Sequence, residues 1–139
     1  MATATSRQVY VNLAVEDLQR SIDFFTALGF SFNPAFTDES ATCMILGDDT
    51  FVMLLVKSRF KDFIPKEICD SASRTEVIVA VSAESRAEVD ELVEKAFAAG
   101  GSPSMDKMNM GFMYAWSFQD PDGHLWEVMY MDPDAAPPA

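Results

Sequence analysis

A single carboxylate inside an apolar strand is the first candidate for chemistry in this chain. Residues 120–130 read DPDGHLWEVMY, a turn written in Pro, Asp and Gly and then a segment that predicts a β-strand. Side chains alternate along a strand, so Glu127 shares a face with Leu125 and Met129, while His124 and Trp126 lie on the other. A carboxylate facing a cleft can take up a proton, whereas one at a sheet edge is solvated or hydrogen-bonded. Both interpretations of Glu127 remain open, and we expect His124 to be a surface or rim residue.

Polar and aromatic side chains elsewhere are candidates for ligand contact. Tyr10 and Asn12 alternate onto one face, where a phenol and an amide can hydrogen-bond a polar group; Tyr10 equally suits the rim of an apolar cleft. Tyr114 and Trp116 either form aromatic walls of a binding site or bury against helices. Four methionines surround Gly111: Met105, Met108, Met110 and Met113. For these, ordinary core filling is favoured over an adaptable ligand wall.

The elements that must position these residues occur twice, in the same order. Strand patterns cover residues 9–15, 31–36, 41–46 and 51–56, and then 76–81, 102–106, 112–118 and 124–130. The first strand of each set precedes a helix pattern: one ends at Gly29, and the other runs from the capping box Ser85–Glu88 to Gly100. VNLAV at 11–15 aligns with VIVAV at 77–81, an offset of 77 − 11 = 66 residues. The sequence therefore predicts two βαβββ modules.

Such half-sheets cannot bury their inner faces alone, so we expect them to pair. The prediction is an α+β fold, a single domain over 1–139, in which two modules form a curved mixed sheet around a cleft. Module one covers about 8–56, a connector 57–74, module two about 75–131, and a frayed tail 132–139. The connector holds five of the ten basic residues, and it is either a lid that attracts an anionic ligand or a solvated linker.

The charge balance restricts the possible partners. Ten Lys and Arg against 22 Asp and Glu give a net charge of −12, which repels phosphate backbones and anionic lipid surfaces. Neither nucleic acid nor a membrane is therefore an expected partner. Cys43 and Cys69 lie outside any metal or redox motif, and no segment has the length of a signal peptide or membrane span. We expect a cytoplasmic protein.

Three segments resemble the vicinal oxygen chelate superfamily, the group of glyoxalase I, bleomycin-resistance proteins and extradiol dioxygenases. They are VEDLQRSIDFF at 15–25, ALGF at 27–30 and DPDGHLWE at 120–127, and the similarity spans about 8–131. Within that group the chain looks most like bacterial proteins labelled predicted lactoylglutathione lyases. The resemblance implies the paired-module fold, a small-molecule ligand and a homodimer.

The same resemblance implies positions for a metal. Metal-dependent members use two histidines and two glutamates on the first and last strands of each module. By position these become Tyr10, Met53, Glu76 and Glu127, so that only carboxylates remain and the usual histidines are absent. Such a pair favours a hard divalent ion, weakly bound or absent. Met53 joins Tyr10, Asn12, Tyr114 and Trp116 as a ligand-binding candidate.

Two function classes follow from the resemblance. The leading hypothesis is a lyase or isomerase similar to lactoylglutathione lyase, in which Glu127 transfers a proton with assistance from Glu76. The alternative is a non-catalytic protein that binds and sequesters an apolar or aromatic compound, as bleomycin-resistance proteins do. A dioxygenase ranks third, because its iron site needs histidines that these positions lack.

Overall fold

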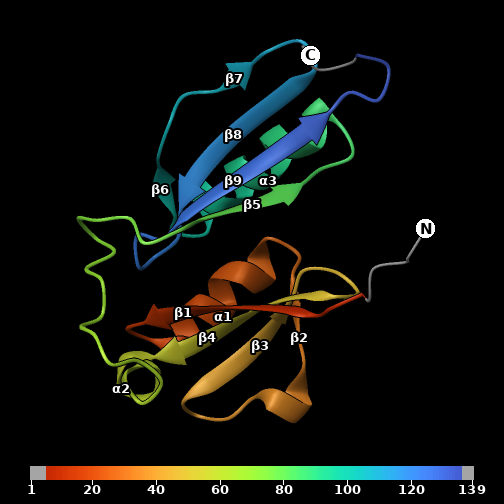
Figure 1. Ribbon diagram of the computed structural model, residues 1–139. Helices are drawn as coiled ribbons and strands as arrows, with labels where there is room; N and C mark the ends of the chain where they lie inside the picture. Colours follow the sequence, from red (N-terminus) through yellow and green to blue (C-terminus); the bar gives the residue numbers. More distant parts are fainter. Residues whose placement is uncertain (1–5, 136–139) are drawn as a thin grey trace. The chain divides into compact units, whose positions relative to one another are not determined.

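The computed structural model describes residues 6–135, which form two compact units (Figure 1). The first unit comprises residues 6–19 and 29–68, and the second comprises 20–28 and 69–135. Each unit holds one mixed β-sheet. The α+β fold class is confirmed, whereas the module and connector boundaries stay a prediction.

The first unit is built on a four-stranded sheet. Its strands are β1 (Val9–Val15), β2 (Ser31–Phe32), β3 (Ala41–Ile45) and β4 (Thr50–Val56), in the order β1-β4-β3-β2. β1 runs parallel to β4, and the other pairs are antiparallel. The buried stripe follows strand alternation and includes Leu13, Val15, Val52 and Leu54. The 3₁₀ helix η1 (Pro34–Phe36) and the short helix α2 (Lys57–Lys61) complete the unit.

The second unit is built on a five-stranded sheet. Its strands are β5 (Ile78–Ser82), β6 (Ser102–Pro103), β7 (Met108–Asn109), β8 (Met113–Gln119) and β9 (Leu125–Met131). The order is β5-β9-β8-β6, with β7 also paired to β8, and β5 is parallel to β9. Helix α3 (Arg86–Ala98) begins at Ser85, whose side-chain oxygen accepts a hydrogen bond from the Glu88 N–H at 3.1 Å. In Figure 1 this helix lies behind β8 and β9.

Most of helix α1 (Leu18–Ala27) belongs to the core of the second unit. The ring of Phe25 lies 4.9 Å from that of Trp126, and the ring of Phe24 lies 6.0 Å from that of Phe118. Phe118 and Trp126 are stacked at 6.3 Å. Through these aromatic contacts α1, which precedes β2 in the chain, packs against the sheet that contains β8 and β9.

Some predicted strands are shorter than their sequence patterns. The segment 31–36 is a strand only at Ser31–Phe32, because Pro34 begins a 3₁₀ turn in which the side-chain carbonyl of Asn33 accepts from the Ala35 N–H. The predicted strand 102–106 ends at Pro103, and β7 was not predicted. In the predicted tail, the Asp132 N–H bonds the Phe112 carbonyl, and residues 136–139 lie outside the described residues.

None of the helices in the described part of the chain has the length and apolar character needed to cross a membrane.

Candidate functional site

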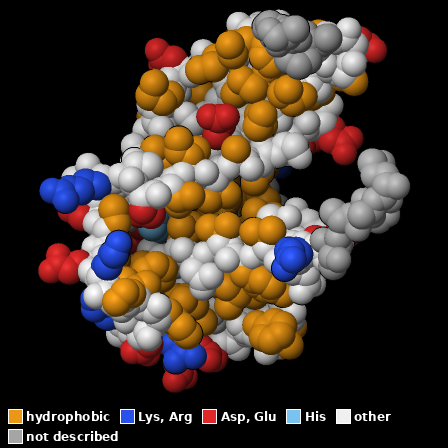
Figure 2. Space-filling view, viewed as in Figure 1, with side chains coloured by type: hydrophobic (Ala, Val, Ile, Leu, Met, Phe, Trp, Pro, Cys, Tyr) orange, Lys and Arg blue, Asp and Glu red, His pale blue; other side chains and the backbone are white. Residues whose placement is uncertain are grey.

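The second sheet has one face covered by α3 and one face that the helix leaves open. On the covered face the Phe97 ring of α3 meets the Trp116 ring edge-on at 5.4 Å, and the Tyr114 hydroxyl donates to Asp90 Oδ1 at 2.7 Å. Alternation places Ala115, Ser117 and Glu127 on the opposite side, which we call the open face. Figure 2, seen from the same side as Figure 1, shows hydrophobic side chains gathered over this region.

A pocket of about 290 Å³ lies on the open face. Its floor consists of Ala115, Ser117 and Glu127, and Trp116 is also among its lining residues. Its wall comes from Met105, Asp106 and Lys107, which lie between β6 and β7, and from Met108, the first residue of β7. We refer to residues 104–107 as the strap.

Two residues of the strap, Met105 and Lys107, hold it against β8 and α3. The Met105 N–H donates to Ser117 Oγ at 3.0 Å. Lys107 places its Nζ 4.5 Å from the centre of the Trp116 ring and 3.4 Å from Asp90 Oδ1. Asp90 also accepts the hydrogen bond from the Tyr114 hydroxyl. Burial, and then this hydrogen bond to a carboxylate, raise the pKa of Tyr114. Trp116 therefore both packs on α3 and lines the pocket, while Tyr114 is engaged on the covered face.

The methionines in and after the strap are exposed. The exposed fractions are 72% for Met105, 49% for Met108 and 53% for Met110. The expectation that these three methionines fill the core is wrong, because they lie along the outer edge of the sheet, where β6 and β7 both pair with β8. Thioether side chains at a pocket wall adapt readily to the shape of an apolar ligand.

Glu127 is the residue that β9 contributes to the pocket floor. It is paired in register with Ser117 of β8 on one side and Ala80 of β5 on the other. Within residues 6–135, its carboxylate has no hydrogen-bond or ion-pair partner. The site therefore presents an available acceptor on its floor, Glu127, and a second carboxylate, Asp106, in its wall.

Glu76 has a different partner from the one the sequence suggested. It precedes β5 rather than lying on it, and its Oε1 is 3.0 Å from His124 Nδ1. His124 is only 3% exposed, so the expectation of a rim residue is wrong: its strand face is the covered one. The neighbouring Cys69 thiol has a raised pKa, through its burial first and the charge of Glu76 second. The β5 residue beside Glu127 is Ala80.

Tyr10, Asn12 and Met53 lie together in the first unit. Asn12 is opposite Met53 in the register of β1 and β4, and Tyr10 is one pleat further along the same face. The Tyr10 ring stacks on Phe51 at 4.9 Å and its hydroxyl donates to Gln8 Oε1 at 3.0 Å. Their role in ligand binding stays a prediction.

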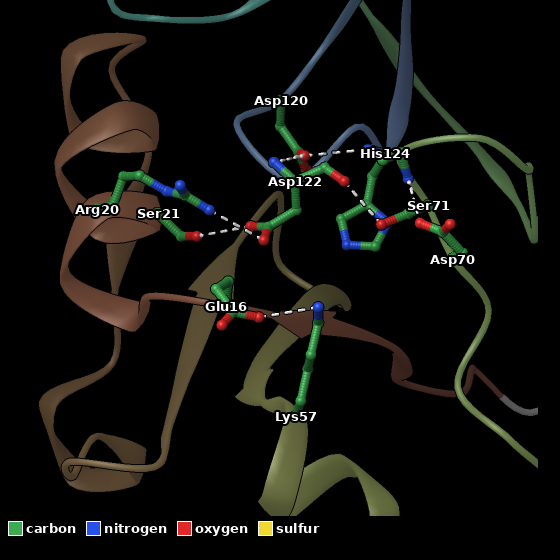
Figure 3. A network of polar contacts seen from close by, with 10 residues as sticks. Glu16, Arg20, Ser21, Lys57, Asp70, Ser71, Asp120, Asp122 and His124 are labelled. Carbon is green, nitrogen blue, oxygen red and sulfur yellow. Dashed lines mark hydrogen bonds and ion pairs between the residues drawn. The ribbon is translucent and has the colours of Figure 1, made fainter.

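Sequence reasoning missed the purpose of the Asp-Pro-Asp-Gly turn, which organises the second unit (Figure 3). Asp120 Oδ1 accepts from the backbone N–H groups of Asp122 and His124, each at 3.0 Å. Its Oδ2 accepts from Trp126 Nε1 at 3.0 Å. Burial raises the pKa of Asp120, although the adjacent His124 opposes that shift. The spacing from Asp120 to Trp126 is the sequence signal that could have indicated this network.

The second carboxylate of the turn connects it to helix α1. Asp122 accepts from Arg20 at 3.0 Å and from Ser21 at 3.4 Å, while its carbonyl accepts from Ser71 Oγ at 2.7 Å (Figure 3). Gly123 follows with φ of +88°, and a Cβ there would lie 2.4 Å from the Ser71 carbonyl oxygen. These contacts stabilise the turn against α1 and Ser71, and a glycine is required at position 123, where the backbone approaches Ser71 most closely.

The connector charges are paired locally where the structure shows them. Lys57 forms an ion pair with Glu16 at 2.8 Å, and Arg59 pairs with Asp62 at 3.7 Å. These pairs lie within the first unit and are solvent-exposed. They favour the solvated-linker interpretation, and the lid stays a prediction.

The donor set does not fit the resident divalent metal that the resemblance suggested. Among residues 6–135, no group of three or more His, Cys, Asp or Glu side chains could hold a metal ion. Glu76 contacts His124, and Glu127 has Ala80 and Ser117 as its strand neighbours. No chemical step is therefore derived through a metal.

Comparison with known proteins agrees with the sheet topology. The chain is 27% identical to a hypothetical protein from S. aureus, covering 91% of this chain and 95% of that one with a TM-score of 0.75. A glyoxalase-related enzyme from Fulvimarina pelagi is 19% identical, with 91% and 88% covered and a TM-score of 0.76. A lactoylglutathione lyase from Agrobacterium tumefaciens is 18% identical, with 91% and 95% covered and a TM-score of 0.66.

No curated protein matches the sequence. A family model does: the Glyoxalase/Bleomycin resistance protein/Dioxygenase superfamily matches residues 7–128, which is most of the chain. The two sheets, each with a parallel pair of first and last strands, are the architecture expected from the repeated modules. The chain therefore belongs to the Glyoxalase/Bleomycin resistance protein/Dioxygenase superfamily.

Proposed function

We propose that this protein binds a small, largely apolar molecule in the pocket on the open face of the second sheet, with Glu127 as its polar contact. The observation that carries the proposal is an unpartnered carboxylate on the floor of a pocket of about 290 Å³, within the part of the chain that the structure describes. Ligand sites are typically concave and mainly apolar, with a few polar groups that fix orientation. The volume of the pocket lies just below the usual range of about 300–1,000 Å³ for such sites.

The wall of the pocket supports binding of an apolar body. Met105 and Met108 have flexible, exposed side chains. The strap beside them is held by the hydrogen bond from Met105 to Ser117 and by the contact of Lys107 with the Trp116 ring. A fixed segment with adaptable side chains can close on ligands of several shapes without reordering its backbone. Binding and sequestration need nothing beyond this arrangement.

A lyase or isomerase activity is the second candidate. Glu127 has the chemistry of a general base that removes a proton from a carbon beside a carbonyl. Support comes from the likeness to the lactoylglutathione lyase of Agrobacterium tumefaciens. Since Glu76 contacts His124, the geometry favours Glu127 acting without Glu76, contrary to the paired role suggested by sequence.

The test compares wild type with Glu127→Gln, which keeps the shape and removes the charge. Glu94→Gln, on the exposed side of α3, is the matched control for loss of one negative charge. Ligand-observed NMR against a set of aromatic and aliphatic fragments should show binding that depends on the pocket. The same three proteins are then assayed for hemithioacetal isomerisation.

The outcomes separate the two candidates. Fragment binding without turnover supports a binding protein, and turnover lost in Glu127→Gln but kept in Glu94→Gln supports a lyase. Absence of both binding and turnover in the wild type refutes the proposal. Homodimer formation and a cytoplasmic location stay predictions; light scattering of the purified chain tests the former, and imaging of a tagged chain in cells the latter.

A further inference from the structure

We propose that the ligand of this pocket is a hydrophobic amine, protonated at neutral pH, whose ammonium group pairs with Glu127. This inference rests on the proposed function and adds the charge class of the ligand. Four features support it: the carboxylate without a partner in the described chain, the engaged Lys107 cation, the engaged Ser117 hydroxyl and the overall charge.

The pocket contains a negative charge that nothing in the described chain neutralises. Glu127 has no ion-pair or hydrogen-bond partner within residues 6–135. Among the residues lining the pocket, Lys107 is the cation, but its Nζ lies 3.4 Å from Asp90 and over the Trp116 ring. Its charge is therefore already shared between a carboxylate and an aromatic face. A ligand that supplies a cation gains a charge-assisted hydrogen bond with Glu127.

Hydrogen-bond donors for an anionic ligand are scarce in the same place. Ser117, the hydroxyl beside Glu127, is 9% exposed and its Oγ accepts the Met105 N–H. Ala115 and the methionines offer no side-chain donor. A carboxylate ligand would meet the like charges of Glu127 and Asp106, which would oppose its binding.

The charge of the whole chain acts in the same direction. A net charge of −12 raises the local concentration of cations and lowers that of anions near the surface. The aliphatic or aromatic part of the ligand would pack on Met105, Met108 and Ala115, which line the pocket. A ligand that carries an amine on an apolar body can therefore contact both Glu127 and the apolar side chains of the pocket.

Three probes of similar shape test the charge class: 1-naphthylmethylamine, 1-naphthylmethanol and 1-naphthoate. Dissociation constants are measured by ligand-observed NMR at low and at physiological salt, with wild type, Glu127→Gln and Glu94→Gln. We expect the amine to bind at least about tenfold more tightly than the alcohol, and the acid most weakly. Glu127→Gln should lower the affinity for the amine to that for the alcohol. Glu94→Gln should leave the order of the three affinities unchanged. Circular dichroism establishes that each variant is folded.

The results distinguish this inference from the function on which it rests. If the amine and alcohol bind equally, or the acid binds most tightly, the charge class is wrong while pocket binding stands. The charge class is also wrong if the preference for the amine survives in Glu127→Gln, since its source then lies elsewhere. If no probe binds the wild type at millimolar concentration, both the proposed function and the inference fail.

Discussion

Replacing Asp120 with alanine should destabilise the fold through its buried hydrogen bonds. Asp120 is 4% exposed and accepts three hydrogen bonds, each at 3.0 Å. Two of its donors are enclosed: Nε1 of Trp126, a side chain that is 0% exposed, and the backbone N–H of His124. Alanine removes the acceptor and leaves both N–H groups without a partner, while water can reach Asp122 more easily.

The magnitude follows from those two donors. A buried polar group that loses its partner costs about 1–3 kcal/mol, so two give about 2–6 kcal/mol. Relief from burying a charged carboxylate offsets part of this, because burial raises the pKa of Asp120 and hence disfavours its ionised form. We therefore expect a loss of about 2–4 kcal/mol in the free energy of unfolding. That is a large share of the ~5–15 kcal/mol that stabilises a typical domain.

Urea denaturation followed by circular dichroism measures this loss as a lower midpoint at unchanged slope. Asp120→Asn keeps one acceptor oxygen and should fall between wild type and Asp120→Ala. Asp106→Ala removes an exposed carboxylate from the strap and should stay within about 0.5 kcal/mol of wild type. An Asp120→Ala protein as stable as Asp106→Ala would show that the three contacts contribute little and refute this reasoning.

Three further predictions concern the same unit. Gly123→Ala should lower the free energy of unfolding by more than about 1 kcal/mol, because φ is +88° and a Cβ would lie 2.4 Å from the Ser71 carbonyl oxygen. Gly47→Ala is the control, since a Cβ there would have nothing within 4 Å. Equal urea midpoints for the two variants would contradict the argument. Asp120 has a folded-state pKa above its ordinary 3.8, so the folded state holds the proton longer and its contribution to stability falls as pH rises from 3.8 through the folded value. Comparing midpoints of wild type and Asp120→Asn across that window should show wild type losing stability relative to the variant, and parallel curves would count against it. Ser85→Ala should cost about 0.5–2 kcal/mol by removing the N-cap of α3, measured by the same denaturation; no change would mean that the capping bond is not significant.

Local patterns were sufficient for the long strands and helices and for the fold class, but not for the short elements η1, α2 and β7. The alternation of β1 and β9, the helical stripe of α3 and its Ser85 cap are properties of neighbouring residues, and each appears where it was predicted. The repeat with an offset of 66 led to two sheets with parallel first and last strands. The predictions failed where one residue changes the backbone, as at Pro34, which ends the extended segment after Phe32.

The candidate site divides in the same way. Alternation alone placed Glu127 on the face opposite Trp126, because that depends only on the period of a strand. Tertiary structure decided the partners: Glu76 meets His124 across 48 residues, and Lys107 of the strap meets Asp90 of α3. Such contacts depend on register and packing between distant segments, which no local pattern encodes. The sequence by itself therefore determined which side chains face the sheet's two sides, and only the packed structure decided which carboxylate remains available for a ligand.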